Sequence, residues 1–175
     1  QAFELLAEFK ILSATRQGEM GVDAINQQVH DYFVQQGFIR KQGNIYPFQP
    51  IMITENNHKN QLFNGDIGII WPTKDGLLAA FTDVEGNIRF IAPGRLPAFE
   101  TVYAMTIHKT QGSEFSNVAL VLPTTSSAIL SRELLYTGIT RAKKHLSIHS
   151  NEVIWRQTVH AQINRYSGLA QRLFG

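Results

Sequence analysis

The sequence predicts an α/β domain that is interrupted by a small antiparallel β-barrel. Three observations lead to this fold class. A strand, a polar loop and an amphipathic helix follow one another near the start of the chain, as in an α/β unit. Short β-like runs separated by turn residues occupy residues 45–97. Apolar runs then alternate with helical patterns again, so we expect one discontinuous α/β domain over residues 1–44 and 98–175.

The first α/β unit begins with an apolar run, residues 9–14, which is typical of a buried strand. The polar residues 15–21 include two glycines and predict a loop. Val22, Ile25 and Val29 recur at helical spacing and predict a helix that ends at Gly37.

The barrel is predicted from four β-like runs and the breaks between them. The runs are residues 51–54, 67–71, 77–82 and 88–92. The breaks at 64–65, 74–76 and 85–87 each contain Gly beside Asn, Asp or Glu, which is good turn chemistry. Pro93, Gly94 and Pro97 mark the exit from the barrel at residue 97.

The second part of the α/β domain is expected to contain three strands and two helices. The strands are residues 102–105, 118–122 and 145–149, of which the second is a continuous apolar run as in a strand covered on both faces. Ser131 is a suitable N-cap for a helix from Arg132 to about Lys143. Asn151 can cap a final helix that reaches about Tyr166.

Composition sets limits on the class of protein. The 175 residues are 43% hydrophobic and 17% charged, which is ordinary for a globular domain. Cysteine is absent, which excludes disulfides and zinc-thiolate sites and fits a reducing compartment, so we expect a cytoplasmic protein. No apolar run approaches the roughly 20 residues of a membrane span, so no membrane partner is expected. The net charge of +2 neither favours nor excludes nucleic acid. Because the chain begins at Gln1, we expect a piece of a longer protein.

Two polar segments, residues 106–115 and 134–144, concentrate hydrogen-bond donors that suit phosphate. Arg141 in the second segment could stabilise charge on a transferring phosphoryl group. It could equally be a surface arginine favoured by a helix C-terminus. Lys143 and Lys144 fit the same helix end as solvated charges. Arg16, after the first strand, is a second candidate phosphate contact, with a plain loop arginine as the alternative.

The first segment offers groups for both a nucleotide and a nucleic acid. Gly112 could let backbone approach phosphate and Glu114 could accept from a ribose hydroxyl, or the two could form a helix C-cap and a polar turn. Thr106 and His108 could donate to nucleic-acid phosphates, although His108 also fits a local hydrogen bond at a helix start. The sequence has no Gly-Lys-Ser/Thr phosphate loop, no strand-borne acidic pair for magnesium and no convincing metal-ligand cluster, so no metal site is expected.

The polar segments are similar to known helicase motifs. Residues 106–115, Thr-Ile-His-Lys-Thr-Gln-Gly-Ser-Glu-Phe, resemble motif V of superfamily 1 DNA helicases, and residues 135–142 resemble motif VI. Residues 9–26 resemble the motif IV region of the RecD-type members, and residues 51–57 and 63–69 resemble the start of their inserted SH3-like domain. The resemblance covers nearly the whole chain. It implies a RecA-like P-loop NTPase second motor domain with an SH3-like β-barrel insert over residues 45–97.

The resemblance also implies roles for single residues. Arg141 and Arg16 would be catalytic residues near the γ-phosphate of ATP. Gln111, Gly112 and Glu114 would bind the nucleotide, and Thr106 and His108 would follow single-stranded DNA. Family members move 5′ to 3′ along that strand by hydrolysing ATP with Mg²⁺. A first motor domain of the same protein, with the phosphate loop and the metal ligands, would complete the site, so we expect this chain alone to be inactive.

RecD-type members that serve as the alpha subunit of exodeoxyribonuclease V work with RecB- and RecC-type subunits in double-strand break repair and recombination. The resemblance implies the same role and partners here. Two alternatives are a stand-alone RecD-like helicase and a non-catalytic scaffold or interaction module. Arg141, Gln111, Gly112 and Glu114 are all present, which argues against a degenerate motor.

Overall fold

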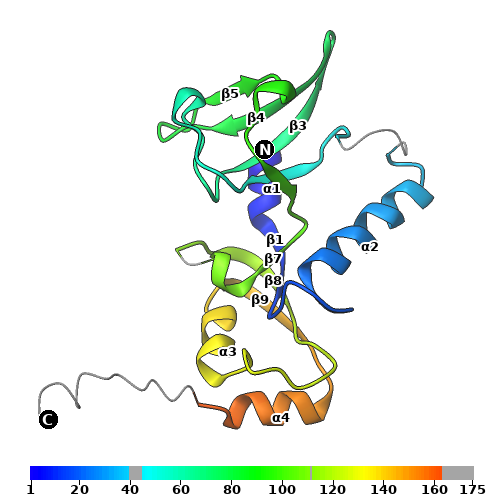
Figure 1. Cartoon of the computed structure of the whole chain (residues 1–175), viewed down its shortest axis with the longest axis vertical. Helices are drawn as coiled ribbons and strands as arrows, with labels where there is room; N and C mark the ends of the chain where they lie inside the picture. Colours follow the sequence, from blue (N-terminus) through cyan, green and yellow to red (C-terminus); the bar gives the residue numbers. More distant parts are fainter. Residues whose placement is uncertain (40–44, 111, 163–175) are drawn as a thin grey trace, which may run out of the picture.

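The computed structural model describes residues 1–39, 45–110 and 112–162 (Figure 1). Its elements in chain order are α1 (Ala2–Glu8), β1 (Phe9–Ser13), α2 (Val22–Gln35), β2 (Pro50–Ile53), η1 (His58–Asn60), β3 (Ile67–Thr73), β4 (Gly76–Thr82), β5 (Ile88–Ile91), η2 (Pro93–Arg95), β6 (Phe99–Thr101), β7 (Ala104–Thr106), η3 (Ile107–Thr110), β8 (Phe115–Val121), α3 (Arg132–Ile139), β9 (Ala142–His149) and α4 (Glu152–His160). They form a parallel sheet with helices and a separate antiparallel sheet, which lies at the far end of the molecule from α3 and α4 (Figure 1). Within the described ranges, no helix has the length and apolar character needed to cross a membrane.

The parallel sheet has the strand order β7-β1-β8-β9. In register, Leu12 of β1 lies between Met105 of β7 and Leu120 of β8. These three buried side chains pack in one cluster with side chains of α3 and α4. Successive strand residues face opposite sides, so Ile11 packs on the other face, in a cluster with Ile25 of α2. Helices therefore cover both faces, which explains the continuous apolar run in β8.

The antiparallel sheet has the order β5-β4-β3-β2-β6 and its own apolar core, which includes Ile70 and Phe81. Gly65, Gly76 and Gly86 have φ angles of +98°, +128° and +86°, so each of the three predicted breaks is a turn that uses the conformational freedom of glycine. The described pairings leave β5 and β6 at the two ends of the sheet. A closed SH3-like barrel therefore stays a prediction.

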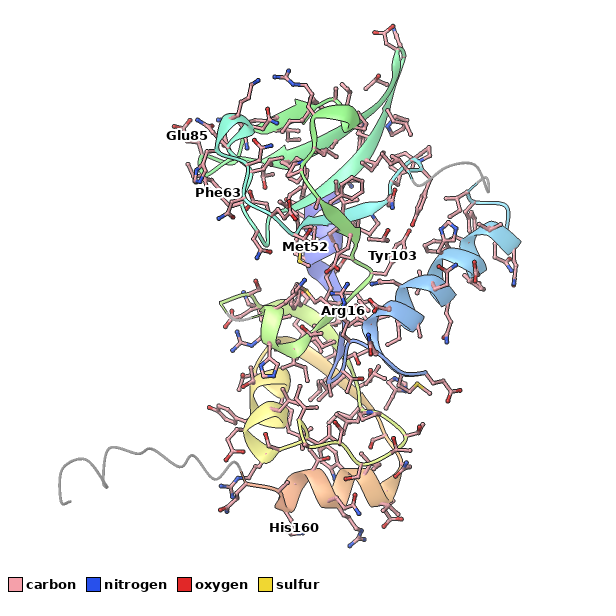
Figure 2. The ribbon with its side chains drawn as sticks, in the orientation of Figure 1. Arg16, Met52, Phe63, Glu85, Tyr103 and His160 are labelled. Carbon is pink, nitrogen blue, oxygen red and sulfur yellow. The ribbon has the colours of Figure 1, made fainter. Side chains whose placement is uncertain are left out.

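Strand β2 joins the cores of the two sheets. Ile51 and Ile53 face the core of the antiparallel sheet, whereas Met52 between them is 1% exposed and belongs to the core of the parallel sheet. Figure 2 shows Met52 where the two parts of the molecule meet. The chain returns beside it, because Val102, between β6 and β7, donates from its backbone N to the carbonyl of Pro50 at 3.0 Å.

Several local predictions are confirmed. Ser131 Oγ accepts from the backbone N of Leu134 at 3.1 Å and caps α3. Asn151 Oδ1 accepts from the backbone N of Ile154 at 2.8 Å and caps α4. Gly37, with φ +74°, follows the end of α2. Side-chain oxygens that satisfy free amide groups, and a glycine past the helix end, are local signals that tertiary packing does not override.

The predicted end of the 132–143 helix is wrong. Helix α3 ends at Ile139, and Arg141 closes its last turn by donating from its backbone N to the carbonyl of Gly138 at 3.2 Å. Strand β9 then begins at Ala142, which pairs with Phe115 of β8. Pairing with the sheet therefore ends the helix earlier than its pattern suggests. Lys143 and Lys144 lie on this strand and not at a helix end.

Further boundaries also differ from the predictions. Helix α4 ends at His160, because Ala161 is extended and its carbonyl accepts from the backbone N of Arg132 at 2.8 Å. The rest of the predicted helix, to about Tyr166, falls largely in residues 163–175, which lie outside the described residues. The strand expected at 102–105 begins at Ala104, and β6 before it belongs to the antiparallel sheet. Helix α1 was not predicted.

Candidate functional site

Arg141 joins the two polar segments of the sequence. Its guanidinium Nη1 donates to the carbonyl oxygens of Thr110 at 3.3 Å and Ser113 at 3.0 Å, both in the first segment. Its Nε donates to the carbonyl of Thr137 at 3.1 Å, and its Nη2 to the Thr140 hydroxyl at 3.3 Å, both in the second. The backbone adds a further link, because the carbonyl of Arg141 accepts from the N of Phe115 at 2.8 Å. The planar guanidinium is therefore fixed by several acceptors at once.

The charge of Arg141 is not neutralised by these contacts. All four acceptors are carbonyl or hydroxyl oxygens, and among the described residues no carboxylate pairs with this guanidinium. The contact with Thr137 satisfies a carbonyl at the end of α3, as the helix-terminus interpretation requires. A residue that only ended the helix would not need the further contacts of Arg141 with the first polar segment. Arg141 is thus both a helix-end residue and a positioned cation.

Close packing between α3 and η3 sets the position of Arg141. Gly138 of α3 faces Leu120 and Ile107, and a Cβ atom on Gly138 would lie 2.8 Å from Leu120 Cδ1 and 3.4 Å from Ile107 Cδ1. A Cβ atom here would require the Leu120 side chain to shift, so glycine allows the closest approach. The carbonyl of Gly138 accepts from the backbone N of Arg141, and the carbonyl of Thr137 accepts from its Nε, so the end of α3 holds Arg141 in place.

The short helix η3 has a buried side and an exposed side. Ile107 and Thr110 are fully buried, and the Thr110 hydroxyl donates to the carbonyl of Ile107 at 2.6 Å. His108 and Lys109 between them are exposed. Thr106, the last residue of β7, is half-buried and pairs in register with Ser13 of β1. The predicted DNA-binding residues Thr106 and His108 therefore lie on an anchored segment, with His108 on its exposed side.

The segment after η3 holds the remaining predicted nucleotide-binding residues. Gly112 has φ +85°, a conformation that side chains disfavour, and space for a Cβ atom is open there. Glu114 pairs with Lys143 of β9 at 3.0 Å, and both side chains are more than half exposed. Gln111 lies outside the described residues.

Arg16 lies in the loop between β1 and α2, and its hydrogen-bond partners differ from those of Arg141. Its Nη2 donates to Glu100 Oε2 at 2.6 Å and lies 3.4 Å from Asp23 Oδ1. The hydrogen bond with Glu100 and the charge of that carboxylate raise the pKa of Arg16 further above neutrality. Unlike Arg141, Arg16 is therefore bound to acidic groups of its own chain. Figure 2 shows it at the junction between α2 and the strand that returns from the antiparallel sheet.

Glu100 is a site residue that the sequence analysis missed. Its Oε1 accepts from Lys109 Nζ at 2.8 Å, so one carboxylate binds the arginine after β1 and the lysine of η3. Although partial burial works against ionisation of Glu100, hydrogen bonds from Arg16 and Lys109 outweigh it and hold its pKa below the usual value. One sequence signal was available, since Glu100 is the single acidic residue between Glu85 and Glu114.

The described residues offer no metal site. No three His, Asp or Glu side chains gather in a suitable arrangement within the described ranges. The carboxylates of Asp23, Glu100 and Glu114 are each within ion-pairing distance of an arginine or a lysine.

Comparisons with known proteins agree with this architecture. A family model described as the UvrD-like helicase C-terminal domain matches residues 101–148, which contain both polar segments. The structure of Pif1 helicase from Bacteroides in complex with ADP-AlF3 and ssDNA superposes with a TM-score of 0.58 and 16% identity, over 95% of this chain and 45% of that chain. Pif1 helicase from Candida albicans gives 0.56 and 16%, over 94% and 49%. These structures show the fold alone, which is that of a RecA-like helicase domain.

Relatives identified by sequence indicate which group of helicases the chain resembles. The chain is 40% identical to the RecBCD enzyme subunit RecD of Haemophilus influenzae over 94% of its length, and 39% identical to that of Mycolicibacterium smegmatis over 99%. It is 30% identical to the ATP-dependent RecD2 DNA helicase of Deinococcus radiodurans over 84%. The chain belongs to the RecD-type superfamily 1 helicases and corresponds to a C-terminal part of such a protein. It spans 25%, 30% and 21% of the length of these three relatives.

Proposed function

We propose that this chain is the second motor domain of an ATP-dependent DNA helicase, and that Arg141 acts on ATP held by a first motor domain of the same protein. The proposal rests on how the Arg141 side chain is held. Four hydrogen bonds to neutral oxygens fix its guanidinium while leaving its positive charge unpaired among the described residues. A preorganised cation of this kind stabilises the charge that develops on a transferring γ-phosphoryl group.

The other site residues take the following roles in this proposal. Arg16 is a second arginine for the nucleotide. Gln111, Gly112 and Glu114 bind phosphate and ribose, and Thr106 and His108 contact the single strand as the helicase moves 5′ to 3′. The exposed side of η3 supports the DNA role. The Glu114–Lys143 pair is exposed and therefore weak, so a ribose hydroxyl can replace the lysine at little cost.

Magnesium does not fit the described residues of this chain, because their nearby carboxylates are already paired with cations. We therefore assign Mg²⁺ and the triphosphate to the first motor domain, and no step here depends on the metal. It follows that the isolated chain is inactive. In the same proposal, the motor comprises residues 1–44 and 98–175 and the SH3-like insert residues 45–97, except that β6 (Phe99–Thr101) pairs with the sheet of the insert.

For the longer protein we propose the role of the alpha subunit of exodeoxyribonuclease V, with RecB- and RecC-type partners, in double-strand break repair and recombination. The support is that two relatives at 39–40% identity are named as RecD subunits of the RecBCD enzyme. A stand-alone helicase is the second candidate, because the Deinococcus relative at 30% identity is named as an ATP-dependent RecD2 DNA helicase. Co-purification of the tagged longer protein from its own cells separates the two, since only the first candidate brings two further subunits.

The motor role is tested by replacing Arg141 in the longer protein. Arg141→Ala is expected to lower single-strand-stimulated ATP hydrolysis by roughly 10³-fold or more, as for arginine fingers, with a smaller change in nucleotide affinity. Arg156→Ala is the matched control, because Arg156 lies exposed on α4 and pairs only with Glu152 among the described residues. Unaltered hydrolysis by the Arg141 variant would exclude the assigned role. A wild-type protein without DNA-stimulated hydrolysis would instead favour a non-catalytic scaffold.

A further inference from the structure

Glu100 connects the two functional ends of the proposed site. It lies on β6, the last strand of the antiparallel sheet, and is only 21% exposed. Its two carboxylate oxygens bind different partners, Arg16 at 2.6 Å and Lys109 at 2.8 Å. In the proposed function, Arg16 serves the nucleotide and Lys109 lies directly after the DNA-facing His108. The largely buried carboxylate of Glu100 thus lies between a proposed nucleotide contact, Arg16, and the segment proposed to contact DNA.

The charges of this triad are not balanced within it. Glu100 carries one negative charge and its two partners carry one positive charge each. Asp23 offsets part of the charge of Arg16 from 3.4 Å. Lys109 has Glu100 as its one carboxylate partner within the described ranges. When either cation leaves, the remaining one loses the repulsion of the other while it keeps the attraction of Glu100, so it is held more tightly.

An anion can reach both cations. Arg16 and Glu100 line a polar cleft of about 340 Å³ between α2 and the strands at the base of the antiparallel sheet, together with Asn26 and His30. The Arg16 side chain is about half exposed, and Lys109 is about one-third exposed. Phosphate oxygens of a nucleotide or of DNA can thus compete with Glu100 for these cations, because a charge-assisted hydrogen bond to phosphate is as strong as one to carboxylate.

We propose that Glu100 is a positioning residue that couples nucleotide binding to DNA binding, an inference that rests on the proposed function. When the γ-phosphate draws Arg16 away, Glu100 holds Lys109 more tightly and withdraws it from the DNA backbone. When DNA takes Lys109, Glu100 holds Arg16 more tightly, so a nucleotide must compete harder for Arg16 in order to bind. The two ligands therefore weaken one another through Glu100, and linkage requires the effect to be equal in both directions. A motor that must release and rebind its track in each ATP cycle can use such a contact.

The test measures single-strand affinity in the longer protein, by fluorescence anisotropy, with and without a non-hydrolysable ATP analogue and Mg²⁺. Glu100→Gln keeps the shape of the side chain and removes its charge. With the analogue bound, this variant is expected to bind DNA tighter than the wild type by about fivefold or more, the lower end of typical coupling. Without nucleotide, the released Lys109 can contact one more phosphate, which steepens the slope of log affinity against log salt by about 0.7.

The chain offers a matched control and a second variant. Glu152→Gln also breaks a glutamate–arginine pair, on α4, and should behave as the wild type in both measurements. Lys109→Gln removes the DNA end of the triad, so the analogue should affect its DNA affinity less, and adding Glu100→Gln to it should change nothing further. If Glu100→Gln fails to fold, the reduced effect of the analogue on Lys109→Gln alone tests the proposal.

The outcomes separate this inference from the proposed function. If the wild type shows DNA-stimulated hydrolysis but Glu100→Gln matches Glu152→Gln in coupling and in salt slope, the coupling role is wrong and the motor role stands. If the wild type binds neither nucleotide nor DNA, the proposed function fails and this inference fails with it.

Discussion

The side chain of Asn26 takes the place of a neighbouring strand for Ala104. Its Nδ2 donates to the Ala104 carbonyl at 3.2 Å, and its Oδ1 accepts from the Ala104 backbone N at 2.8 Å. Strand β7, which contains Ala104, is the edge of the parallel sheet in the described residues. An unpaired edge strand would leave backbone groups without partners beside α2. Asn26 therefore fixes α2 to the strand that leads into η3 and the candidate site.

The first prediction concerns this pair. Asn26→Ala leaves both backbone groups of the buried Ala104 unpaired, so we expect the free energy of unfolding of the chain to fall by about 1–3 kcal/mol. Chemical denaturation checks the value. Gln27→Ala is the control, since among the described residues the Gln27 side chain bonds only to the exposed Asp31 side chain on the same helix. We expect it to change stability by less than about 0.5 kcal/mol. Equal stability of the two variants would show that the Asn26 contacts contribute little.

The second prediction concerns the loop that presents Arg16. A Cβ atom on Gly21 would lie 2.5 Å from the carbonyl oxygen of Arg16 and 2.6 Å from backbone atoms of Gln17. Backbone atoms cannot move aside as a side chain can, so Gly21→Ala must shift the loop that contains Arg16. We expect a loss of about 1–3 kcal/mol in unfolding free energy, as for overpacking. Gly94→Ala is the control, because a Cβ atom there meets no atom within 4 Å. If the Gly21 variant is as stable as the Gly94 variant, the close contact between residue 21 and the backbone of Arg16 and Gln17 is not present.

The sequence could predict the fold class and most elements, because those depend on local signals. Helix α2 with Gly37 at its end, the caps Ser131 and Asn151, and the glycine turns of the antiparallel sheet are all set by residues within a few positions of one another. The end of α3 could not be predicted, since it depends on β9 pairing with β8. Glu100 was missed for the same reason. Its partner Arg16 is 84 positions away, and no local pattern indicates that contact.

The sequence predicted which residues form the candidate site but not the contacts that they make. The hydrogen bonds from Arg141 to Thr110 and Ser113 depend on the packing of η3 against α3. The spacing of residues in the sequence does not indicate that packing. The sequence likewise did not indicate that Arg16 and Arg141 have different kinds of partner. Both arginines suit phosphate, but one is held by neutral oxygens and the other by carboxylates.

The third prediction concerns the pH dependence of stability. Lys10 of β1 is 2% exposed, donates to the carbonyl of Val102 at 3.3 Å and lies 5.9 Å from the centre of the Phe115 ring. Burial lowers the pKa of Lys10 to about 8. Its pKa in the unfolded chain is about 10.4, so the folded state binds fewer protons between these values. Stability should therefore rise with pH from about 8 towards 10.4, by roughly 3 kcal/mol in full.

The measurement compares the wild type with Lys10→Met by denaturation at pH 7 to 9.5. The variant should be more stable at pH 7 and lack the rise, so the two stabilities converge as pH increases. The Tyr46–Tyr103 pair sets the upper limit of this window. Burial raises the pKa of both hydroxyls, so their contribution falls once unfolded tyrosines ionise near pH 10. Parallel stability curves for the two proteins would mean that Lys10 reaches solvent.

The last prediction separates the charge of Arg141 from its shape. Arg141→Lys keeps a positive charge but has no donor at the position of Nε, so it loses the bond to Thr137, and its single ammonium replaces the rigid fork that reaches Thr110 and Ser113. The ammonium is then free to move, and a displacement of about 1 Å at a reacting centre costs on the order of 10²-fold in rate. In the longer protein we expect Arg141→Lys to lower kcat for DNA-stimulated ATP hydrolysis by at least that factor, with little change in the KM for ATP. Arg132→Lys is the control, since Arg132 donates from its backbone to Ala161 and a lysine preserves that contact. A lysine variant as fast as the wild type would mean that charge alone suffices, and that the bonds from Arg141 to the first polar segment serve only the fold.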